Sequence, residues 1–388
     1  MAIPKLALIP SGYKDGKVYS VLPNSGDGDF TFSRGSNATR VNKDGLIETV
    51  TGDLPRLDYS DSSCPSLLLE PQSTNLVSYS EDFTNSSWGK LSGGIGSTPI
   101  LDFGYASPDG TSKATKVTLD KGNSSDLSDF SMLKFEVTEF DGVGSIYLKG
   151  DSGGEDITLF TRGAESVVVT LTTEWQRYDI SSTQSTQLSL RLRGSDNTND
   201  VATFYAWGAQ LEEGSYATSY IPTQGSAVTR LADVCNNGGN EQVFNDSEGV
   251  LFAEIEYPNS TTSSNLRIAI SDGTGSNRIL IQNVSFAPNR LQFYVIANGV
   301  VSTDFLTDLS DITSFNKIAF KYKTNDFSVW INGFEVLTDT SGSTFSDGTL
   351  NEFAFDGGDG AFDFYGNTKQ IKYFNKALTD IELKALTT

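Results

Sequence analysis

Histidine is absent from this chain of 388 residues, and its absence excludes several kinds of chemistry. Without imidazole there is no Ser-His-Asp or Cys-His catalytic centre, and no zinc site that uses histidine ligands. Cysteine occurs only twice, at Cys64 and Cys235. Two cysteines so far apart do not indicate a disulfide framework, so we expect both thiols to remain reduced.

Basic residues are scarce, because 28 lysines and arginines stand against 49 aspartates and glutamates, for a net charge of −21. Such a surface repels phosphate backbones and anionic membranes, so we expect no nucleic-acid partner. Neutral glycans and divalent cations remain compatible with it, and its main expected role is to keep the protein soluble.

Long hydrophobic runs are also missing. Runs such as Leu67–Leu69 and Val167–Val169 are far too short to span a bilayer. The N-terminal residues lack the basic start and apolar core of a signal peptide. We therefore expect no membrane insertion and no secretion by the usual route.

The residues that are abundant favour an all-β fold. The chain has 37 glycines, 24 phenylalanines and 15 tyrosines, a composition typical of short strands joined by tight turns. Asn298-Gly299 and Asn332-Gly333 each separate two β-like runs and predict hairpins with type I′ turns. Thr379 and Glu382 have the spacing of a capping box and predict a short helix near the C-terminus.

The distribution of strands and turns divides the chain into three parts. Residues 1–80 alternate strand fragments with Gly and Asn breaks, which predicts an irregular attachment or oligomerisation segment. Residues 81–224 contain a series of short strands and predict a β-sandwich of jelly-roll type. Residues 225–388 predict a second β-sandwich that ends in the helix.

Several stretches resemble a known family. Phe32–Asn42, Pro55–Tyr59 and Leu67–Leu76 resemble the N-terminal part of bacteriophage structural proteins that carry carbohydrate-binding modules. Tyr79–Trp88 and Trp207–Thr223 resemble the entry to and the exit from the jelly-roll module of these proteins.

The C-terminal third adds a looser resemblance. Val329–Gly333 and Ala377–Leu383 are similar to concanavalin A-like (laminin-G-like) lectin sandwiches. Together the resemblances imply a tail or head fibre or appendage subunit on the exterior of a phage particle, assembled in the host cytoplasm. They imply a homotrimer that contacts other virion proteins through residues 1–80 and binds a bacterial surface polysaccharide. A purely structural decoration or spacer is the alternative, because a fold alone does not define a ligand.

A glycan depolymerase is a third alternative, and its catalytic residues are hard to find. Glycan-cleaving enzymes of concanavalin-like fold resemble one another in a strand motif Glu-x-Asp-x-x-Glu, and the nearest match here is Glu254, Glu256 and Asn259. An amide at the third position cannot protonate a leaving group. We therefore expect no enzymatic activity and an ordinary strand at this position.

Two acidic clusters suggest calcium as the one cofactor to consider. Asp356, Asp359 and Asp363 lie on a glycine-rich turn, and Asp151 with Glu155 and Asp156 forms a weaker cluster. Hard oxygen ligands suit Ca²⁺, although neither cluster has EF-hand spacing and Asp beside Gly is also ordinary turn chemistry.

Sugar binding needs exposed aromatic faces beside polar groups, since pyranose rings stack on π surfaces. Four aromatic residues are the candidates for such platforms, namely Trp88, Trp330, Phe364 and Tyr365. A tryptophan within a strand is more often part of the core, and this interpretation competes with sugar binding at Trp330.

Overall fold

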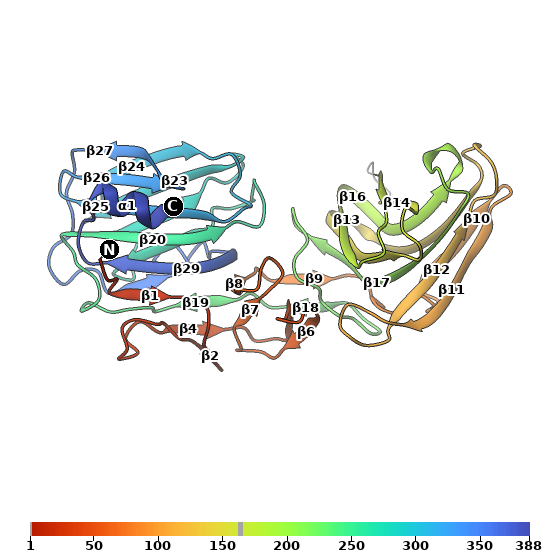
Figure 1. The fold of residues 1–388 in the computed structure, drawn as a ribbon, viewed down its shortest axis with the longest axis horizontal. Coiled ribbons are helices and arrows are strands. Elements are labelled where there is room, and N and C mark those ends of the chain that lie inside the picture. Colours follow the sequence, from red (N-terminus) through yellow and green to blue (C-terminus); the bar gives the residue numbers. More distant parts are fainter. Residues whose placement is uncertain (1, 162–165) are drawn as a thin grey trace. The chain divides into compact units, whose positions relative to one another are not determined.

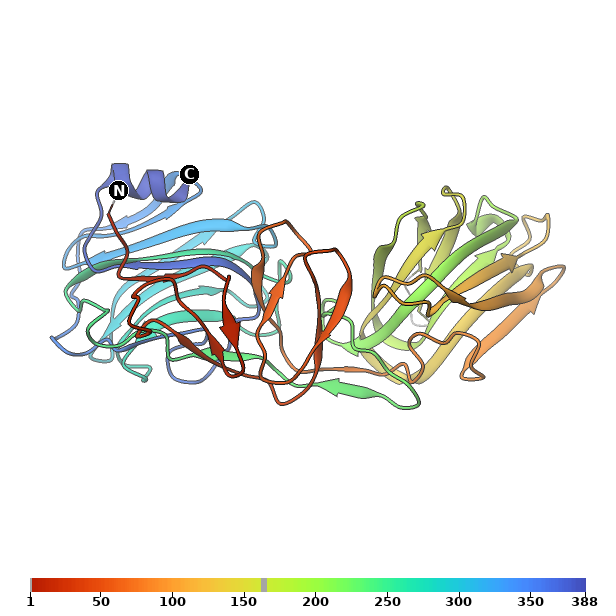
Figure 2. The same cartoon turned by 60° about the horizontal axis from the view of Figure 1, so that its bottom comes forward.

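The computed structural model describes residues 2–161 and 166–388, and it divides the chain into two compact units. Unit 1 consists of Met1–Gly45, Val50–Pro71 and Leu231–Thr388, so both chain ends belong to it (Figure 2). Unit 2 consists of Leu46–Thr49 and Gln72–Arg230. Both units are built almost entirely from β-strands (Figure 1), which confirms the predicted all-β class.

Unit 1 contains a large sheet, a five-stranded sheet and a small four-stranded sheet. The large sheet has the order β27 (Phe334–Asp339), β26 (Phe327–Ile331), β25 (Asn316–Lys323), β20 (Glu248–Glu256), β29 (Gly366–Phe374), β8 (Ser66–Leu69) and β7 (Arg56–Asp58), with β1 (Leu6–Leu8) also paired to β29. The five-stranded sheet has the order β24 (Val300–Asp308), β23 (Arg290–Ala297), β22 (Arg278–Asn283), β21 (Arg267–Ser271) and β28 (Glu352–Ala354). The small sheet has the order β19 (Val234–Asn236), β4 (Phe30–Ser33), β3 (Lys17–Val18) and β2 (Tyr13–Lys14).

The core of unit 1 follows from the two-residue period of its strands. Alternate residues of β20, including Leu251, Ala253 and Ile255, join alternate residues of β22 and β23 in one buried hydrophobic cluster. Successive side chains of a strand point to opposite faces, so each sheet contributes one face to this core. The result is the predicted β-sandwich in the C-terminal third of the chain.

The opposite face of the large sheet is covered by α1 (Asp380–Thr387), which lies against β25 and β26 (Figure 1). Leu383 and Leu386 of this helix pack with Trp330 and Phe252 in a second hydrophobic cluster. The predicted capping box is confirmed, because the Thr379 side chain accepts from the Glu382 backbone N–H while the Glu382 side chain accepts from the Thr379 N–H. No helix among residues 2–161 and 166–388 is long and apolar enough to span a membrane.

Both predicted hairpin turns are confirmed in unit 1. Strands β23 and β24 meet at Asn298-Gly299, and β26 and β27 meet at Asn332-Gly333. All four turn residues have positive φ, from 49° at Asn332 to 86° at Gly333. Asn and Gly adopt this region at low cost, which is why local sequence alone identifies the turns.

A buried network of charged side chains links distant segments of unit 1. Asp233 accepts from Arg34 Nη1 at 2.9 Å and from Arg56 Nη2, and Arg56 Nη1 also pairs with Glu70 at 2.5 Å. Arg34, Arg56 and Asp233 are at most 1% exposed. Two cations and two anions therefore balance one another inside the unit, as burial of charge requires. Three of these residues lie within the stretches that resemble phage structural proteins.

Unit 2 is one continuous, curved sheet around a single hydrophobic core. Its strand order is β11 (Ser97–Tyr105), β12 (Ala114–Asp120), β17 (Val201–Glu213), β13 (Phe130–Gly150), β16 (Gln176–Arg193), β14 (Asp156–Phe160) and β15 (Ser166–Thr170), with β10 (Trp88–Gly93) also paired to β13. The long strands β13 and β16 shift register between Glu136 and Gly142, where a β-bulge bends a sheet. The short elements of the whole chain not yet named are β5 (Ala38–Val41), which belongs to unit 1, and β6 (Ile47–Val50), β9 (Ser73–Asn75), β18 (Val228–Arg230) and the 3₁₀ turn η1 (Gly194–Asp196).

The ends of the unit 2 chain segment are tied to β17 by buried polar groups. Asn75 donates to the Ala209 and Ile221 carbonyl oxygens, at 3.1 and 2.8 Å. Glu212 accepts from the Ser73 hydroxyl at 2.5 Å and from the Thr218 backbone N–H at 2.8 Å. These bonds satisfy polar groups that burial would otherwise leave without partners.

The two compact units differ from the division predicted at residues 80 and 225. Strand β1 pairs with β29, so Leu6 lies opposite Tyr373, and β8 also pairs with β29. Strands β1, β7 and β8 therefore complete the large sheet of unit 1, where the sequence predicted a separate irregular segment. These strands are too short to form a core alone, and pairing with strands some 300 residues later leaves no local signal in the sequence.

Candidate functional site

Three of the four predicted aromatic platforms are buried. Trp88 is 2% exposed, packs against Phe83 and Phe135, and donates its indole N–H to the Tyr79 carbonyl oxygen at 2.9 Å. Trp330, 7% exposed, lies beneath α1, and Phe364, 1% exposed, lies in the sandwich core. None of the three presents a ring face for a sugar, because each ring is already covered by core side chains.

Tyr365 is the one predicted platform that is partly exposed, and its hydroxyl donates to Asp363 Oδ2 at 3.1 Å.

The three carboxylates predicted to bind calcium have different partners. Asp356 accepts from Asn236 and from the Gly358 N–H, while Asp359 pairs with Arg278 at 3.1 Å. Among the described residues no three Asp, Glu, Cys or His side chains are grouped closely enough to hold a metal ion. The predicted calcium site, including the weaker cluster at Asp151, is therefore not formed.

The carboxylate pair on β20 is held by amides of the neighbouring strand. Glu254 accepts from Gln370, and Glu256 accepts from Asn367 at 2.8 Å. Burial raises the pKa of Glu256 to about 7, opposed by the hydrogen bond from Asn367. A raised pKa of this kind is one property of a general acid, but the side chain faces a structural amide.

A different set of residues forms the best candidate site, on the outward face of unit 2. Ser131, Leu133 and Phe135 of β13 face the core side, so Phe130, Met132 and Lys134 point outward. The paired strand β16 follows the same alternation, with Arg193 opposite Phe130 and Arg191 opposite Met132. Strand β14 adds Phe160, which lies opposite Ser189 of β16.

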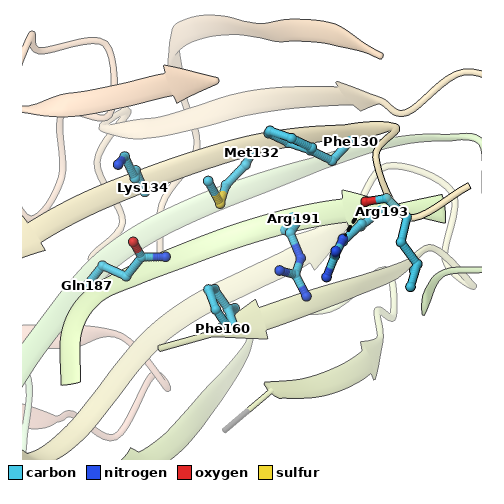
Figure 3. A pocket seen from close by; sticks show the side chains of 8 residues that line it. Phe130, Met132, Lys134, Phe160, Gln187, Arg191 and Arg193 are labelled. Atoms are coloured by element: carbon cyan, nitrogen blue, oxygen red, sulfur yellow. Dashed lines mark hydrogen bonds between the residues drawn. The ribbon is translucent and has the colours of Figure 1, made fainter. Parts of the chain in front are cut away.

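These outward side chains surround a cavity of about 320 Å³. Figure 3 shows Phe130, Met132 and Lys134 in a row along β13, with Gln187, Phe160 and Arg191 facing them. The cavity volume lies at the lower end of the range for small-molecule sites. Leu127 and Arg193 also line the cavity, and Arg193 Nε donates to the Leu127 carbonyl oxygen at 2.7 Å.

The polar groups of the cavity are mostly cationic. The Arg191 guanidinium lies 4.4 Å from the centre of the Phe160 ring and 3.3 Å from Asp196. Burial lowers the pKa of Arg191, and Arg193 contributes in the same direction. Lys134 pairs with Glu136 on the same face of β13. Each cation is therefore held in position by a carboxylate outside the cavity.

Gln187 supplies an uncharged hydrogen-bonding group to the cavity. Its side chain is 3% exposed and its amide donates to Ser189 Oγ at 3.1 Å. An amide, guanidinium groups and two aromatic rings around one hollow can bind a polar molecule that also has an apolar face. A sugar ring has this chemistry, because its hydroxyls form hydrogen bonds and its C–H face stacks on aromatic rings.

The sequence contained a partial signal for this site. Phe130-x-Met132-x-Lys134 and Arg191-x-Arg193 both alternate with apolar residues, as in a strand with one solvated face. What the sequence could not show is that the two strands pair in the register that places Met132 opposite Arg191. That register depends on partners about 60 residues apart.

A second, smaller hollow lies elsewhere on unit 2, with a volume of about 280 Å³. Tyr105 and Tyr205 pack there with ring centres 5.2 Å apart. Asp151 accepts from Lys116 at 2.9 Å and from the Tyr205 hydroxyl at 2.8 Å. These polar groups satisfy one another, which leaves fewer of them for a ligand than the first cavity offers.

Comparisons with known proteins give no family for the chain. No protein-family model matches it, and no curated protein matches its sequence. The CBM40 domain of Ruminococcus gnavus IT-sialidase bound to α2,3-sialyllactose is 16% identical over 38% of this chain and 86% of its own, with a TM-score of 0.32. Domain 4 of AbnA, a GH43 extracellular arabinanase of Geobacillus stearothermophilus in complex with arabinotriose, is 15% identical over 45% of this chain and 83% of its own, also with a TM-score of 0.32.

Domains LG4-5 of the mouse laminin α1 chain are 8% identical over 68% of this chain and 91% of their own, with a TM-score of 0.25. All three TM-scores lie below 0.5, so these likenesses say nothing about what this chain binds.

Proposed function

We propose that the chain is a glycan-binding structural protein on the exterior of a bacteriophage particle, a tail or head fibre or appendage subunit that adheres to bacterial surface polysaccharide. The cavity on the outward face of β13, β16 and β14 is the observation that carries the glycan-binding part. The phage part is supported by the resemblance of residues 32–76 and 207–223 to phage structural proteins.

The cavity suits a saccharide better than an apolar ligand. Phe130 and Phe160 offer ring faces, while Gln187, Lys134 and Arg191 offer hydrogen-bond donors around them. A site open on one side of a sheet would bind each sugar weakly. Copies on one particle then multiply the affinity, which fits the proposed homotrimer and its attachment to other virion proteins.

The composition of the cavity favours binding over cleavage. Its described lining consists of Leu127, Phe130, Met132, Lys134, Phe160, Gln187, Arg191 and Arg193, and none of these is a carboxylic acid. Glycoside hydrolysis generally requires two carboxyl groups flanking the scissile bond. We therefore propose a binding protein without catalytic activity.

A glycan array with the full chain tests this proposal. Wild type should bind a subset of bacterial glycans, and Phe160→Ala should weaken binding at least tenfold because it removes a stacking face and the ring beneath Arg191. Phe334→Ala is the matched control, since Phe334 is 73% exposed on β27 of unit 1 and lies outside the cavity.

Three outcomes would overturn the proposal. Absence of binding to any bacterial glycan would favour a spacer, equal loss in Phe160→Ala and Phe334→Ala would remove the cavity as the site, and release of reducing ends from a bound polysaccharide would establish a depolymerase.

The virion location has its own test, a cryo-EM reconstruction of purified particles. A projecting density that fits this chain supports the exterior location. Purified particles that lack the chain would contradict it.

A further inference from the structure

The five-stranded sheet of unit 1 also has an outward face, and it carries a second cluster of cationic and aromatic side chains. Ile268, Ile270, Ile279 and Ile281 of β21 and β22 face the sandwich core. The alternation therefore turns Arg267 of β21 and Arg278 of β22 outward. Tyr294 of β23 lies on the same face, opposite Leu280. The glycine-rich segment 356–362 folds over one edge of this face, where Arg278 donates to the Gly357 carbonyl oxygen at 2.6 Å.

Arg267 stands out because, within residues 2–161 and 166–388, no hydrogen bond or ion pair holds its guanidinium. The guanidinium instead makes a cation–π contact with the Phe362 ring, whose centre lies 3.9 Å from Cζ. Its Nε is buried without a hydrogen-bond partner. Burial lowers the pKa of Arg267 and Arg278 lowers it further, while Asp359 and Tyr294 act in the opposite direction. In a chain with 49 acidic residues, a half-buried arginine without a carboxylate partner is unusual.

The carboxylates around Arg267 are engaged by other side chains or lie on a neighbouring strand. Asp359 pairs with Arg278 at 3.1 Å, and Asp304 accepts from Gln292 at 2.9 Å. Glu352 lies on the neighbouring strand β28, opposite Ser271. Asp359, whose charge also attracts Arg267, is thus paired with Arg278, and among the described residues no carboxylate forms an ion pair with Arg267.

Phe362 is held in an uncommon backbone conformation beside Arg267. Its φ is 62° and its side chain is 49% exposed. A bulky residue in the left-handed region is strained, and such strain concentrates at ligand sites. The exposed Phe362 ring lies against the Arg267 guanidinium, 3.9 Å from Cζ to the ring centre. Tyr294 adds a second, partly exposed aromatic ring on the same face.

We propose that Arg267, with Phe362 and Tyr294 beside it, binds the carboxylate of an acidic saccharide. A guanidinium presents two parallel N–H groups that match a carboxylate, and this pairing is strong when partly desolvated. The two rings provide the apolar contact that a pyranose needs next to its carboxylate. The net charge of −21 opposes any polyanion, nucleic acid included, so the proposed ligand is an oligosaccharide with a single carboxylate that Arg267 meets locally. This site lies in unit 1 and does not depend on the cavity of unit 2.

The test uses the full chain on a panel of glucuronate-, galacturonate- and sialate-bearing oligosaccharides, each printed beside its methyl ester. The ester keeps the ring and removes the charge. Wild type should prefer at least one free acid over its ester. Arg267→Gln should lose this preference by at least tenfold, and Arg267→Lys, which keeps the charge without the fork, should lose part of it.

Arg290→Gln is the matched control. Arg290 is the first residue of β23 and lies on the same face as Tyr294, four residues later. It already has a carboxylate partner in Asp308 at 2.6 Å. Arg290→Gln removes the same charge as Arg267→Gln and should keep the preference. Thermal unfolding of each variant checks that it is folded.

Several results would overturn the inference. Wild type could bind acids and esters equally, or the preference could survive in folded Arg267→Gln. Selective binding of a glutamate-rich peptide to Arg267 in place of the saccharides would also overturn it. A preference that disappears in Phe160→Ala instead would assign it to the unit 2 cavity.

Discussion

Asp233 lies outside the resembling stretches, yet it contacts three residues that lie within them. It accepts from Arg34 and Arg56 in the interior of unit 1, and its Oδ2 also accepts from the Glu70 backbone N–H at 2.9 Å. Three residues from the N-terminal part of the chain therefore meet at one carboxylate that follows more than 160 residues later. The resemblance includes Arg34, Arg56 and Glu70 but not Asp233, and the structure brings all four into one buried charge network of unit 1.

Replacing this carboxylate should destabilise unit 1 strongly. Asp233→Asn keeps the shape but leaves two buried arginines with one carboxylate between them, and breaking a buried pair in this way costs about 3–5 kcal/mol. Asp308→Asn is the control, since its pair with Arg290 is exposed and solvent-screened and should contribute little to stability. Denaturant unfolding measures both, and similar losses for the two variants would contradict a structural role for the network.

Glu256 should make the stability of unit 1 depend on pH. Its pKa is raised by burial to about 7, from an ordinary value of 4.5. Between these values the folded state keeps a proton that the unfolded state releases, so stability falls as the pH rises from about 4.5 to 7. Glu256→Gln should remove this part of the dependence and raise the melting temperature at pH 8 relative to wild type. Melting curves at pH 5 and pH 8 check it, and an unchanged difference between the two pH values would refute it.

Residue type alone did not identify the ring faces. Trp88 and Phe364 were reasonable platforms by their chemistry, yet both are core residues, while Phe130 and Phe160 line the cavity. Exposure decides which aromatic residue can bind a sugar, and exposure depends on which face of each strand points outward. That choice is made by the whole sheet.

Elements with local signals were predicted correctly from the sequence. The two Asn-Gly hairpins and the capping box of α1 depend on backbone conformations that a few neighbouring residues determine. Pairing between distant strands was not predicted, as for β1 with β29. The alternation of β13 and β16 was visible, but their mutual register, which forms the candidate site, was not.

The helix α1 provides a test at the scale of one element. Thr379→Ala removes the side chain that accepts from the Glu382 N–H and should cost about 1 kcal/mol. Because α1 covers Trp330, fraying of the helix should also expose the indole to water and shift its fluorescence to longer wavelength. Unfolding followed by fluorescence measures both effects. A variant as stable as wild type would show that packing alone holds the helix.

At the scale of the whole molecule, each unit is made of segments that are separate in sequence. Unit 1 takes residues from both ends of the chain, and in sequence almost all residues of unit 2 come between these two parts. A fragment of residues 231–388 should therefore fold poorly, because β29 loses its partners β1 and β8 and Asp233 loses both arginines. An amide NMR spectrum of the fragment should lack dispersion. A dispersed spectrum with cooperative unfolding close to that of the full chain would contradict this account.

The most direct test of glycan binding uses Met132, which lines the cavity. The chain has 2 methionines, and the other is Met1. Labelling the methionine methyl groups with ¹³C gives one NMR signal inside the proposed site and one far from it in sequence. A glycan selected on the array should shift the Met132 signal in a saturable way and leave the Met1 signal unchanged. A saturating glycan that leaves the Met132 signal in place would show that the cavity of unit 2 is not the site.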